Sequence, residues 1–308
     1  MSAQDAATSF AIAADAEAVT RLLSKEYLAD DRTALVLWLA EKLDRPVLIE
    51  GPPGVGKTDL ARAAAAVTGR ELLRLQCYEG LDEAKALYEW DYGKQMLYTQ
   101  MLREVVQQAT AGASSLREGV ARISAQESAL YTEQFLLPRP LLKAILAPVS
   151  VVLLVDEVDR AEPEFEALLL EILAERQVTI PELGTLRSRA RPLVILTTNG
   201  SRDMSDALRR RCLHLFLDYP SPSRETAIVE LRLPGIAHTL ARFVAKLRKL
   251  DLRKSPSLSE TLDWGRALLL LGASSLDRTV VAETLGLLLK YEEDREKAEE
   301  KLDVLLSD

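Results

Sequence analysis

The sequence predicts an α/β domain with a mainly parallel sheet, followed by a small all-helical domain. Short, continuous apolar runs are typical of strands buried on both faces, and segments with helical periodicity separate these runs. After the turn at residues 219–223, the remaining runs have helical periodicity. The 308 residues are enough for two domains. We therefore expect the α/β domain over residues 1–220 and the helical domain over residues 221–308.

The individual elements follow from the spacing of apolar residues and from helix-breaking residues. Residues 15–44 have a helical pattern that ends before Pro46. Residues 46–50 form a short apolar run, a glycine-rich turn follows, and the alanine-rich stretch 58–67 ends at Gly69, which predicts strand, loop and helix. Further strands are predicted at residues 72–75, 151–155, 193–197 and 213–217, and further helices at residues 224–233, 237–250, 258–271 and 276–306.

Composition excludes disordered and membrane-spanning proteins. Hydrophobic residues make up 48% and charged residues 28%, which is ordinary for a globular chain. No apolar run approaches the roughly 20 residues that span a bilayer, so we expect no membrane partner. Asp5, Asp15 and Glu17 precede the first basic residue, the reverse of an export leader, which predicts a cytoplasmic protein. The two cysteines, Cys77 and Cys212, are then expected to be free, buried thiols.

The net charge of −8 is concentrated near the end of the chain. Residues 291–308 hold eight acidic and three basic residues, so the rest of the chain is close to neutral. The acidic balance is therefore weak evidence against nucleic-acid binding. Leu302, Leu305 and Leu306 have helical spacing, and we expect them to pack while the acidic side chains face solvent.

A phosphate-binding loop is the strongest motif. GPPGVGKT at residues 51–58 directly follows the first predicted strand and has all four fixed positions of GxxxxGK[ST]. Backbone N–H groups of such a loop, with the start of the next helix, bind phosphate oxygens. Lys57 would hold the β and γ phosphates of ATP, and the Thr58 hydroxyl would ligate Mg²⁺. The predicted cofactor-binding residues here are Gly51, Pro52, Pro53, Gly54, Val55, Gly56, Lys57, Thr58 and Asp59.

Polar residues at the ends of two other predicted strands complete this site. Asp156 and Glu157 follow the apolar run 151–155. Asp156 would hold the metal through its waters, and Glu157 would polarise the attacking water. Asn199 ends another strand and could position that water or contact the γ-phosphate. The alternatives are a helix N-cap for the Asp-Glu pair and a simple turn for Asn199.

These elements together resemble the AAA+ ATPases, and within them the MoxR branch and its CoxD type. CoxD-type proteins are associated with maturation of carbon monoxide dehydrogenase and related molybdenum hydroxylases. The stretches that carry the resemblance are RLQCYEGLDEAKALYEWDYGKQ at 74–95, FLLPRPLLKAI at 135–145, LVDEVDRAEPEFEALLLEIL at 154–173, VTIPELGTLR at 178–187 and SDALRRRCLHLFLDYP at 205–220.

The resemblance implies an AAA+ P-loop domain whose parallel five-stranded sheet has the order 5-1-4-3-2, with a helical lid domain. The Asn199 strand would then lie between the P-loop strand and the Asp156 strand. An insert near the second helix and a hairpin before the Asn199 strand are also implied. Lys57 and Asp156 are 99 residues apart, which leaves room for the insert.

AAA+ enzymes complete each active site with an arginine from the adjacent subunit of a ring, here expected to be a hexamer. Among Arg209, Arg210 and Arg211, the MoxR-type pattern favours Arg211, which precedes Cys212, and Arg210 second. The alternative is a solvated basic helix end. Relatives carry a lid arginine at the start of the third lid helix. This chain has Glu260 near that point, and Arg266 is the candidate lid residue.

The resemblance implies an ATP-driven chaperone that remodels a metalloenzyme precursor. Its expected partners are a von Willebrand factor A-domain protein and a molybdenum hydroxylase client. We expect residues 74–90 to form the surface that engages them, and we expect this surface to be unrelated to hydrolysis. The alternative is a nucleic-acid motor or loader that uses Arg187, Arg189 and Arg191 and the basic stretch 242–254. A third hypothesis is a nucleotide-dependent scaffold. The presence of Glu157 argues against this hypothesis.

Overall fold

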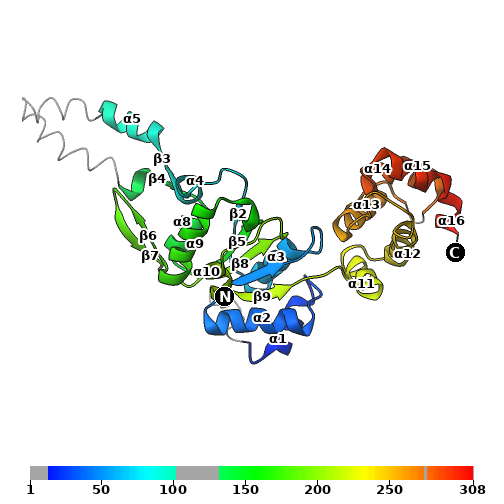
Figure 1. The fold of residues 1–308 in the computed structure, drawn as a ribbon, viewed down its shortest axis with the longest axis horizontal. Coiled ribbons are helices and arrows are strands. Elements are labelled where there is room, and N and C mark those ends of the chain that lie inside the picture. The colour runs from blue at the N-terminus through cyan, green and yellow to red at the C-terminus, as the bar shows by residue number, and fades with distance from the viewer. Residues whose placement is uncertain (1–12, 102–131, 274–275, 308) are drawn as a thin grey trace, which may run out of the picture.

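The computed structural model describes residues 13–101, 132–273 and 276–307, and a parallel five-stranded sheet forms its centre (Figure 1). The strand order is β2-β5-β8-β1-β9. Numbered along the chain as five core strands, this is the predicted order 5-1-4-3-2, and β8 lies between β1 and β5 as expected. The strands are β1 Val47–Glu50, β2 Leu72–Gln76, β5 Val152–Asp156, β8 Leu193–Thr198 and β9 Leu213–Phe216.

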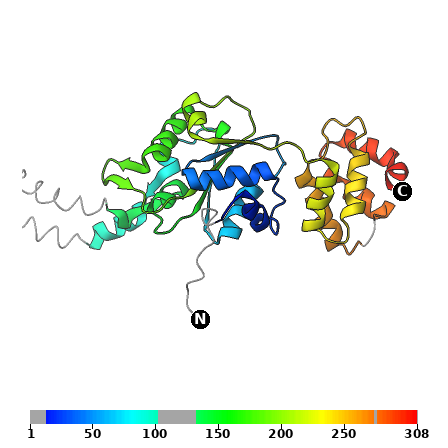
Figure 2. The ribbon, with the colours of Figure 1, turned by 90° about the horizontal axis from the view of Figure 1, so that it is seen from below.

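Helices cover both faces of the sheet (Figures 1 and 2), and the inner strands β5, β8 and β1 are buried on both sides, whereas β2 and β9 carry exposed residues. One face packs on the N-terminal helices and α3, the other on α8, α9 and α10. Residues alternate between these faces: Val152 and Leu154 point to the first core, Leu153 and Val155 to the second. The helix bounds are α3 Lys57–Thr68, α8 Pro140–Leu146, α9 Pro163–Glu175 and α10 Asp206–Arg211, with the 3-10 turn η3 Val158–Arg160 before α9.

The N-terminal helical stretch is interrupted, which corrects the expectation of one pattern over residues 15–44. It forms α1 Ala16–Leu23 and α2 Asp31–Leu43. The carboxylate of Asp30 accepts a hydrogen bond from the Thr33 amide at 2.8 Å and so starts a new helix. The segment between the helices brings Tyr27 beside the phosphate-binding loop, where the site uses it.

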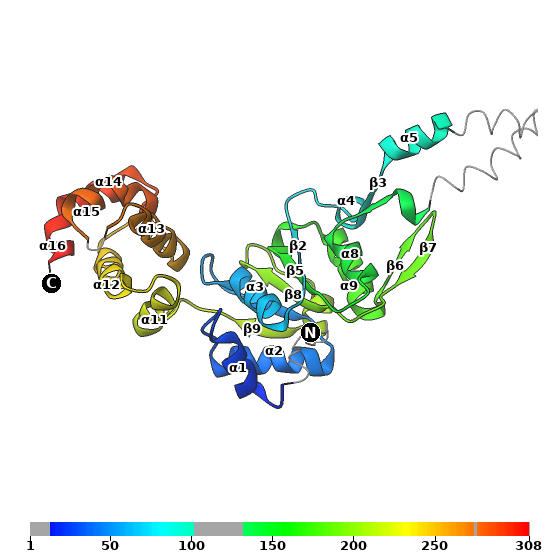
Figure 3. The same ribbon diagram turned by 180° about the vertical axis from the view of Figure 1, so that it is seen from behind.

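The segment between β2 and β5 contains the expected insert, and a hairpin precedes β8 as expected. The middle of the insert, residues 102–131, lies outside the described residues. Figures 1 and 3 place α5 and the β6–β7 hairpin at the end of the molecule remote from the C-terminal helices. The bounds are α4 Glu83–Leu87, β3 Tyr88–Trp90, α5 Tyr92–Met101, η2 Glu133–Phe135 and β4 Leu136–Pro138 in the insert, and β6 Gln177–Ile180 and β7 Gly184–Arg187 in the hairpin.

The C-terminal region is helical, and the boundary between residues 220 and 221 stays a prediction. The pattern over residues 276–306 forms three helices rather than one. Leu302 and Leu305 are buried in this region's own core, as expected, whereas Asp294 is an acid that is also buried, accepting hydrogen bonds from the amides of residues 253 and 254. The helices are α11 Pro222–Arg232, α12 Ala237–Leu247, α13 Leu258–Leu270, α14 Arg278–Leu288, α15 Glu292–Glu300 and α16 Leu302–Leu306.

Two further expectations concern single features. Both cysteines, Cys77 and Cys212, are free and buried as predicted, and burial raises the pKa of each thiol to about 12. Across the described ranges, no helix combines the length and apolar character required to cross a bilayer.

Candidate functional site

The candidate site lies where the carboxyl ends of β1, β5 and β8 meet at one edge of the sheet. The loop after β1 curls over this edge into α3, and a cavity of about 390 Å³ opens beside it. Lining residues come from the loop and α3, from the ends of β2, β5 and β8, and from the helical region: Pro53, Gly54, Gly56, Lys57, Thr58, Asp59, Arg62, Arg74, Asp156, Glu157, Thr197, Asn199, Ser259, Leu262, Asp263 and Arg266.

Glycines permit the conformation of the loop. Gly56 has a φ of 94°, a left-handed conformation that side chains rarely adopt. Gly51 lies so close to β9 that a Cβ atom there would sit 2.0 Å from the carbonyl oxygen of Leu217. Both positions therefore require glycine for steric reasons.

The buried ammonium of Lys57 lies inside this loop. Its Nζ donates to the carbonyl oxygens of Gly51 at 2.5 Å and Pro52 at 2.9 Å, and to Oδ1 of Asn199 at 2.7 Å. Burial lowers the pKa of Lys57, while Asp159, Asp156 and Glu157 act in the opposite direction. Neutral oxygens alone contact this cation, so an anionic ligand could replace them with a gain in charge pairing.

Thr58 and Asp156 supply adjacent oxygens at the start of α3 and the end of β5. The Thr58 hydroxyl lies 3.2 Å from both carboxylate oxygens of Asp156. Thr197 also donates to this carboxylate, at 2.5 Å, and Arg74 donates through Nε at 3.0 Å and Nη2 at 2.6 Å. Hydroxyl and carboxylate oxygens are the ligands that Mg²⁺ prefers, so this pair fits the expected metal.

Glu157 is held by contacts from β2, from the end of β8 and from η3. Its φ of 56° turns the chain sharply after β5, and its amide donates to Thr197 Oγ1 at 2.9 Å. The carboxylate accepts from Asn199 Nδ2 at 3.3 Å, from Gln76 Nε2 at 3.1 Å and from Arg160 at 3.1 Å. The amide of Asn199 therefore connects the Glu157 carboxylate to the Lys57 ammonium.

Asp159 is a buried carboxylate that the sequence reasoning missed. Its Oδ2 accepts from the amides of Asn199 at 3.2 Å and Ser201 at 2.9 Å, and from the Ser201 hydroxyl at 2.6 Å. Burial alone would raise the pKa of Asp159, but these hydrogen bonds lower it below its ordinary value. Asp159 fixes the turn that carries Asn199. Its position in the sequence, three residues after Asp156, could have identified Asp159 as part of the site.

A second cavity, of about 410 Å³, adjoins the first and shares part of the loop with it. Tyr27 lies against Gly56, and burial raises its pKa to about 12. Leu28, Phe216 and Leu262 add apolar surface. The two cavities together suit an elongated ligand with phosphates at one end and a flat apolar group at the other.

The helical region reaches this site through the start of α13. A Cβ atom on Gly54 would sit 2.7 Å from Cβ of Ser257, so the two segments touch. Arg266 lines the phosphate-side cavity, where its guanidinium pairs with Asp263 at 2.8 Å. Asp59 pairs with Arg62, another cation of this cavity, at 3.3 Å. Their roles toward a ligand stay predictions.

The three arginines of α10 differ in their contacts. Arg209 pairs with Glu50 of its own chain at 3.2 Å. Arg210 and Arg211 are exposed, have no side-chain partner among the described residues and do not line their own cavity. The guanidinium of Arg45 donates to the carbonyl oxygens of Arg210 at 2.5 Å, Arg211 at 3.1 Å and Cys212 at 3.2 Å, which anchors this helix end.

The start of the stretch 74–90 contacts Asp156 and Glu157, so this part of the stretch belongs to the candidate site and is not the separate surface that we expected. Arg74 and Gln76 lie on β2, whose parallel pairing places Gln76 opposite Asp156. They contact Asp156 and Glu157 respectively, and Arg74 also donates to Gln76. Polar and apolar residues alternate at the end of LLRLQ, which places the side chains of residues 74 and 76 on one face of the strand. This alternation could have identified both residues as a pair.

A family model described as AAA domain (dynein-related subfamily) matches residues 46–212. This range includes four of the five strands of the sheet, the phosphate-binding loop and α10, and it ends just before β9. It covers more than half of the 308 residues.

Matches to curated proteins are much shorter. Lon protease 1 of Myxococcus xanthus is 51% identical and Lon protease 3 of Sorangium cellulosum 49% identical, each over 61 residues or 20% of this chain. The chain covers only 7% of the length of either protease. Among solved structures, a RuvB point mutant from Thermotoga maritima aligns with a TM-score of 0.44 at 17% identity, covering 89% of this chain and 70% of that one.

Proposed function

Because the chain belongs to the AAA domain family, dynein-related subfamily, we propose that it is a Mg²⁺-dependent ATPase of the MoxR type that remodels a client protein. The observation that carries the ATPase part is the position of Asn199. Its amide contacts Lys57 at 2.7 Å and Glu157 at 3.3 Å. A group that binds phosphate and a group that activates water are thereby held at one cavity.

The residues of this cavity divide the work of hydrolysis. Lys57 and the loop amides hold the phosphates, and Thr58 and Asp156 hold Mg²⁺. Glu157 orients and polarises the attacking water, and Asn199 fixes the Glu157 carboxylate. The metal, when bound, neutralises charge that develops on the phosphate oxygens. Tyr27, Leu28 and Phe216 pack on the adenine base.

The proposed active form is a ring, expected to be a hexamer. The side chains of Arg210 and Arg211 have no partner among the described residues of their own chain. An exposed arginine that does not reach its own cavity is suited to the cavity of an adjacent subunit. Arg211 is the proposed trans arginine, with Arg210 second. A charge supplied in this way stabilises the transition state of phosphoryl transfer.

The proposed client is an immature molybdenum hydroxylase of the carbon monoxide dehydrogenase type, engaged in the cytoplasm with a von Willebrand factor A-domain partner. Support comes from the CoxD-type resemblance of residues 74–95. After its two site residues this stretch carries exposed apolar side chains: Tyr78, Tyr92 and, just beyond it, Met96, Leu97 and Tyr98. Such side chains are suited to protein contact.

The basic residues behind the nucleic-acid alternative are partly engaged within the chain. Arg248 makes two hydrogen bonds to Glu225. Lys254 pairs with Glu260. Cations neutralised in this way contribute little to phosphate binding, so the client-remodelling function is the better supported one.

Two substitutions test the ATPase assignment. Lys57→Ala removes the cation that meets the phosphates, and ATP should no longer bind. Glu157→Gln keeps the metal ligands but removes the charge that polarises water, so ATP should bind and persist. Retained nucleotide and turnover are measured for both, with the exposed Lys143→Ala and Glu164→Gln as controls. Hydrolysis at the wild-type rate by Glu157→Gln would show that the assignment is wrong.

A deletion strain tests the client. The hydroxylase polypeptide should be made and folded but lack its full metal or sulfur complement, as measured by metal analysis. Affinity capture with the Glu157→Gln protein should recover the von Willebrand factor A-domain partner, because blocking hydrolysis accumulates the tighter complex. A fully loaded hydroxylase in that strain would contradict the maturation role and leave the ATPase assignment intact.

A further inference from the structure

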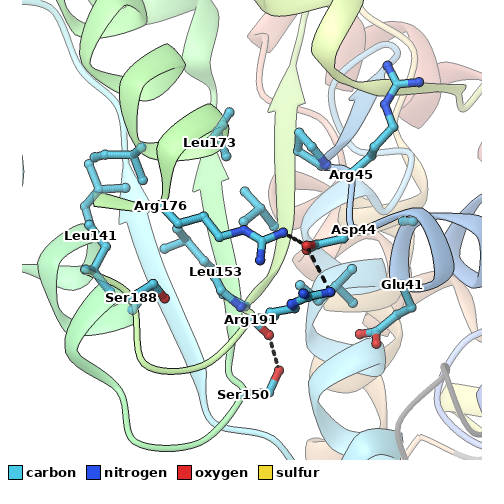
Figure 4. Close-up of a pocket in the computed structure, with 18 of the residues that line it drawn as sticks. Glu41, Asp44, Arg45, Leu141, Ser150, Leu153, Leu173, Arg176, Ser188 and Arg191 are labelled. Atoms are coloured by element: carbon cyan, nitrogen blue, oxygen red, sulfur yellow. Dashed lines mark hydrogen bonds and ion pairs between the residues drawn. The ribbon is translucent and has the colours of Figure 1, made fainter. Parts of the chain in front are cut away.

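A third cavity lies at the edge of the sheet opposite the phosphate-binding loop (Figure 4). Its volume is about 290 Å³, and the start of β8, the end of α2, α8 and the end of α9 form its walls. None of its lining residues belongs to the nucleotide site. The AAA+ assignment leaves this cavity without a role.

Positive charge is in excess in this cavity. Arg176 and Arg191 both pair with the single carboxylate of Asp44, Arg191 at 3.4 Å. Neither guanidinium has another carboxylate partner among the described residues. Arg45 extends away from Asp44 in Figure 4 and contacts carbonyl oxygens instead.

Glu41 and Arg70 are the other charged groups that line the cavity. They pair with each other, so together they add no net charge. Counting all lining groups, the four arginines face two carboxylates. The cavity can therefore accept an anion without a metal ion to neutralise it.

The backbone places two of these charged side chains with unusual dihedral angles. Asp44 has a φ of 53° and Arg176 a φ of 51°, each at the end of a helix where glycine is common. Glu157 is the remaining non-glycine residue with positive φ in the described parts of the chain. Such conformations concentrate at functional sites, and here two of them meet in one ion pair.

The opposite wall of the cavity is apolar. Leu141 and Ile145 of α8 face it, together with Leu153 of β5 and Leu173 of α9. A charged wall and an apolar wall in one cavity select a ligand that has both kinds of surface.

We propose that this cavity binds a small organic anion, in which a carboxylate or phosphate head contacts Arg176 and Arg191 and an aliphatic body packs on α8. Arg176 immediately precedes the β6–β7 hairpin, and its carbonyl oxygen accepts from the Ser188 amide at 2.7 Å on the other side of the hairpin base. A ligand here would therefore contact the base of the hairpin and the end of α2 together.

Isothermal titration calorimetry with octanoate and octyl phosphate tests the proposal on the full chain. The Lys57→Ala protein is used so that the phosphate-binding loop does not compete for the probe. One or both anions should bind saturably, and the neutral octanamide should bind at least about tenfold more weakly because it lacks the charge. The stronger of the two anions identifies the head group. Equal binding of octanamide, or no saturable binding of either anion, would overturn the proposal.

Two substitutions that change the charge in opposite directions locate the probe. Arg191→Gln removes an exposed guanidinium and should weaken binding about tenfold. Asp44→Asn removes the competing carboxylate, and since asparagine tolerates positive φ it should fold and bind the anion more tightly. Arg187→Gln, an exposed hairpin residue outside the cavity, should leave binding unchanged. Equal affinities for all three variants would show that the anion binds elsewhere, which also overturns the proposal.

Discussion

The two edges of the central sheet carry charge in different balance. The cavity at the carboxyl ends of the strands is lined by four carboxylates and four cations, whereas the cavity at the opposite edge has two carboxylates and four arginines. The first arrangement suits a ligand that brings its own metal ion, because the carboxylates can hold the metal while the cations hold the phosphates. The second suits an anion alone. One sheet can thus present two kinds of anion site, which differ in the number of carboxylates that line them.

The edges also differ in how firmly their charged groups are fixed. Asp156 accepts hydrogen bonds from Thr197 and Arg74, and Glu157 accepts from Asn199, Gln76 and Arg160. At the opposite edge, Arg176 and Arg191 share the single carboxylate of Asp44, and Glu41 pairs with Arg70. Catalysis requires groups held in fixed positions, and the carboxyl edge is the edge that meets this requirement.

The largest expected effect comes from an arginine outside both cavities. Arg211→Ala should bind ATP nearly normally but hydrolyse it about 10³-fold more slowly, because the transition-state charge at the neighbouring subunit is no longer stabilised. Mixing it with Lys57→Ala protein should restore part of the activity through hybrid interfaces. Turnover of the mixtures is measured in rings shown to exchange subunits. Absence of recovery would count against Arg211, and Arg210 would be tested next.

Asn199→Ala should give the next largest effect, at the carboxyl edge itself. It removes the amide that connects Lys57 to Glu157, and hydrolysis should fall about 10²-fold while ATP still binds. Asn199→Asp should be at least as slow, because it places a carboxylate 3.3 Å from the position of the Glu157 carboxylate. Single-turnover rates with bound ATP give the measurement. An unchanged rate for Asn199→Ala would show that this residue serves only to form the turn.

The sequence predicted those parts of the site that local rules determine. Gly51 to Thr58 could be identified because a phosphate-binding loop depends on glycines at fixed spacing. Asp156, Glu157 and Asn199 could be brought to the same edge because the carboxyl ends of parallel strands coincide there.

What the sequence did not predict depends on long-range packing. Arg74 and Gln76 reach the carboxylates only because β2 pairs with β5 in one particular register, and a single strand does not reveal its partner. The break between α1 and α2 depends on the Asp30 cap, a local signal that the long apolar pattern obscured. The cavity around Asp44 forms where several segments that are separate in the sequence come together. No sequence motif indicates that they do so.

Arg45 lines the cavity at the opposite edge and contacts the end of α10, and its substitution should have an intermediate effect. Arg45→Met removes the hydrogen bonds that hold the end of α10, so hydrolysis should fall about tenfold. If Arg45 acts by positioning Arg211, the defect lies on the donor side of the subunit interface. Mixing with Lys57→Ala should then restore activity, and mixing with Arg211→Ala should not. The exposed Arg189→Met is the control. Recovery in neither mixture would indicate a general loss of structure instead.

The smallest expected effect concerns stability and Asp159. Its folded pKa lies below its ordinary value of 3.8, so the ionised carboxylate stabilises the fold above that pH, and this contribution is lost as the pH falls through the folded pKa. Asp159→Asn keeps the shape but replaces charge-assisted hydrogen bonds with neutral ones, and should lower the free energy of unfolding by about 1 kcal/mol near neutral pH. Below the folded pKa the wild-type carboxyl is neutral too, and the difference between the proteins should shrink. Urea denaturation at several pH values measures this convergence. A difference that stays constant into the acid range would show that Asp159 acts through packing rather than through its charge.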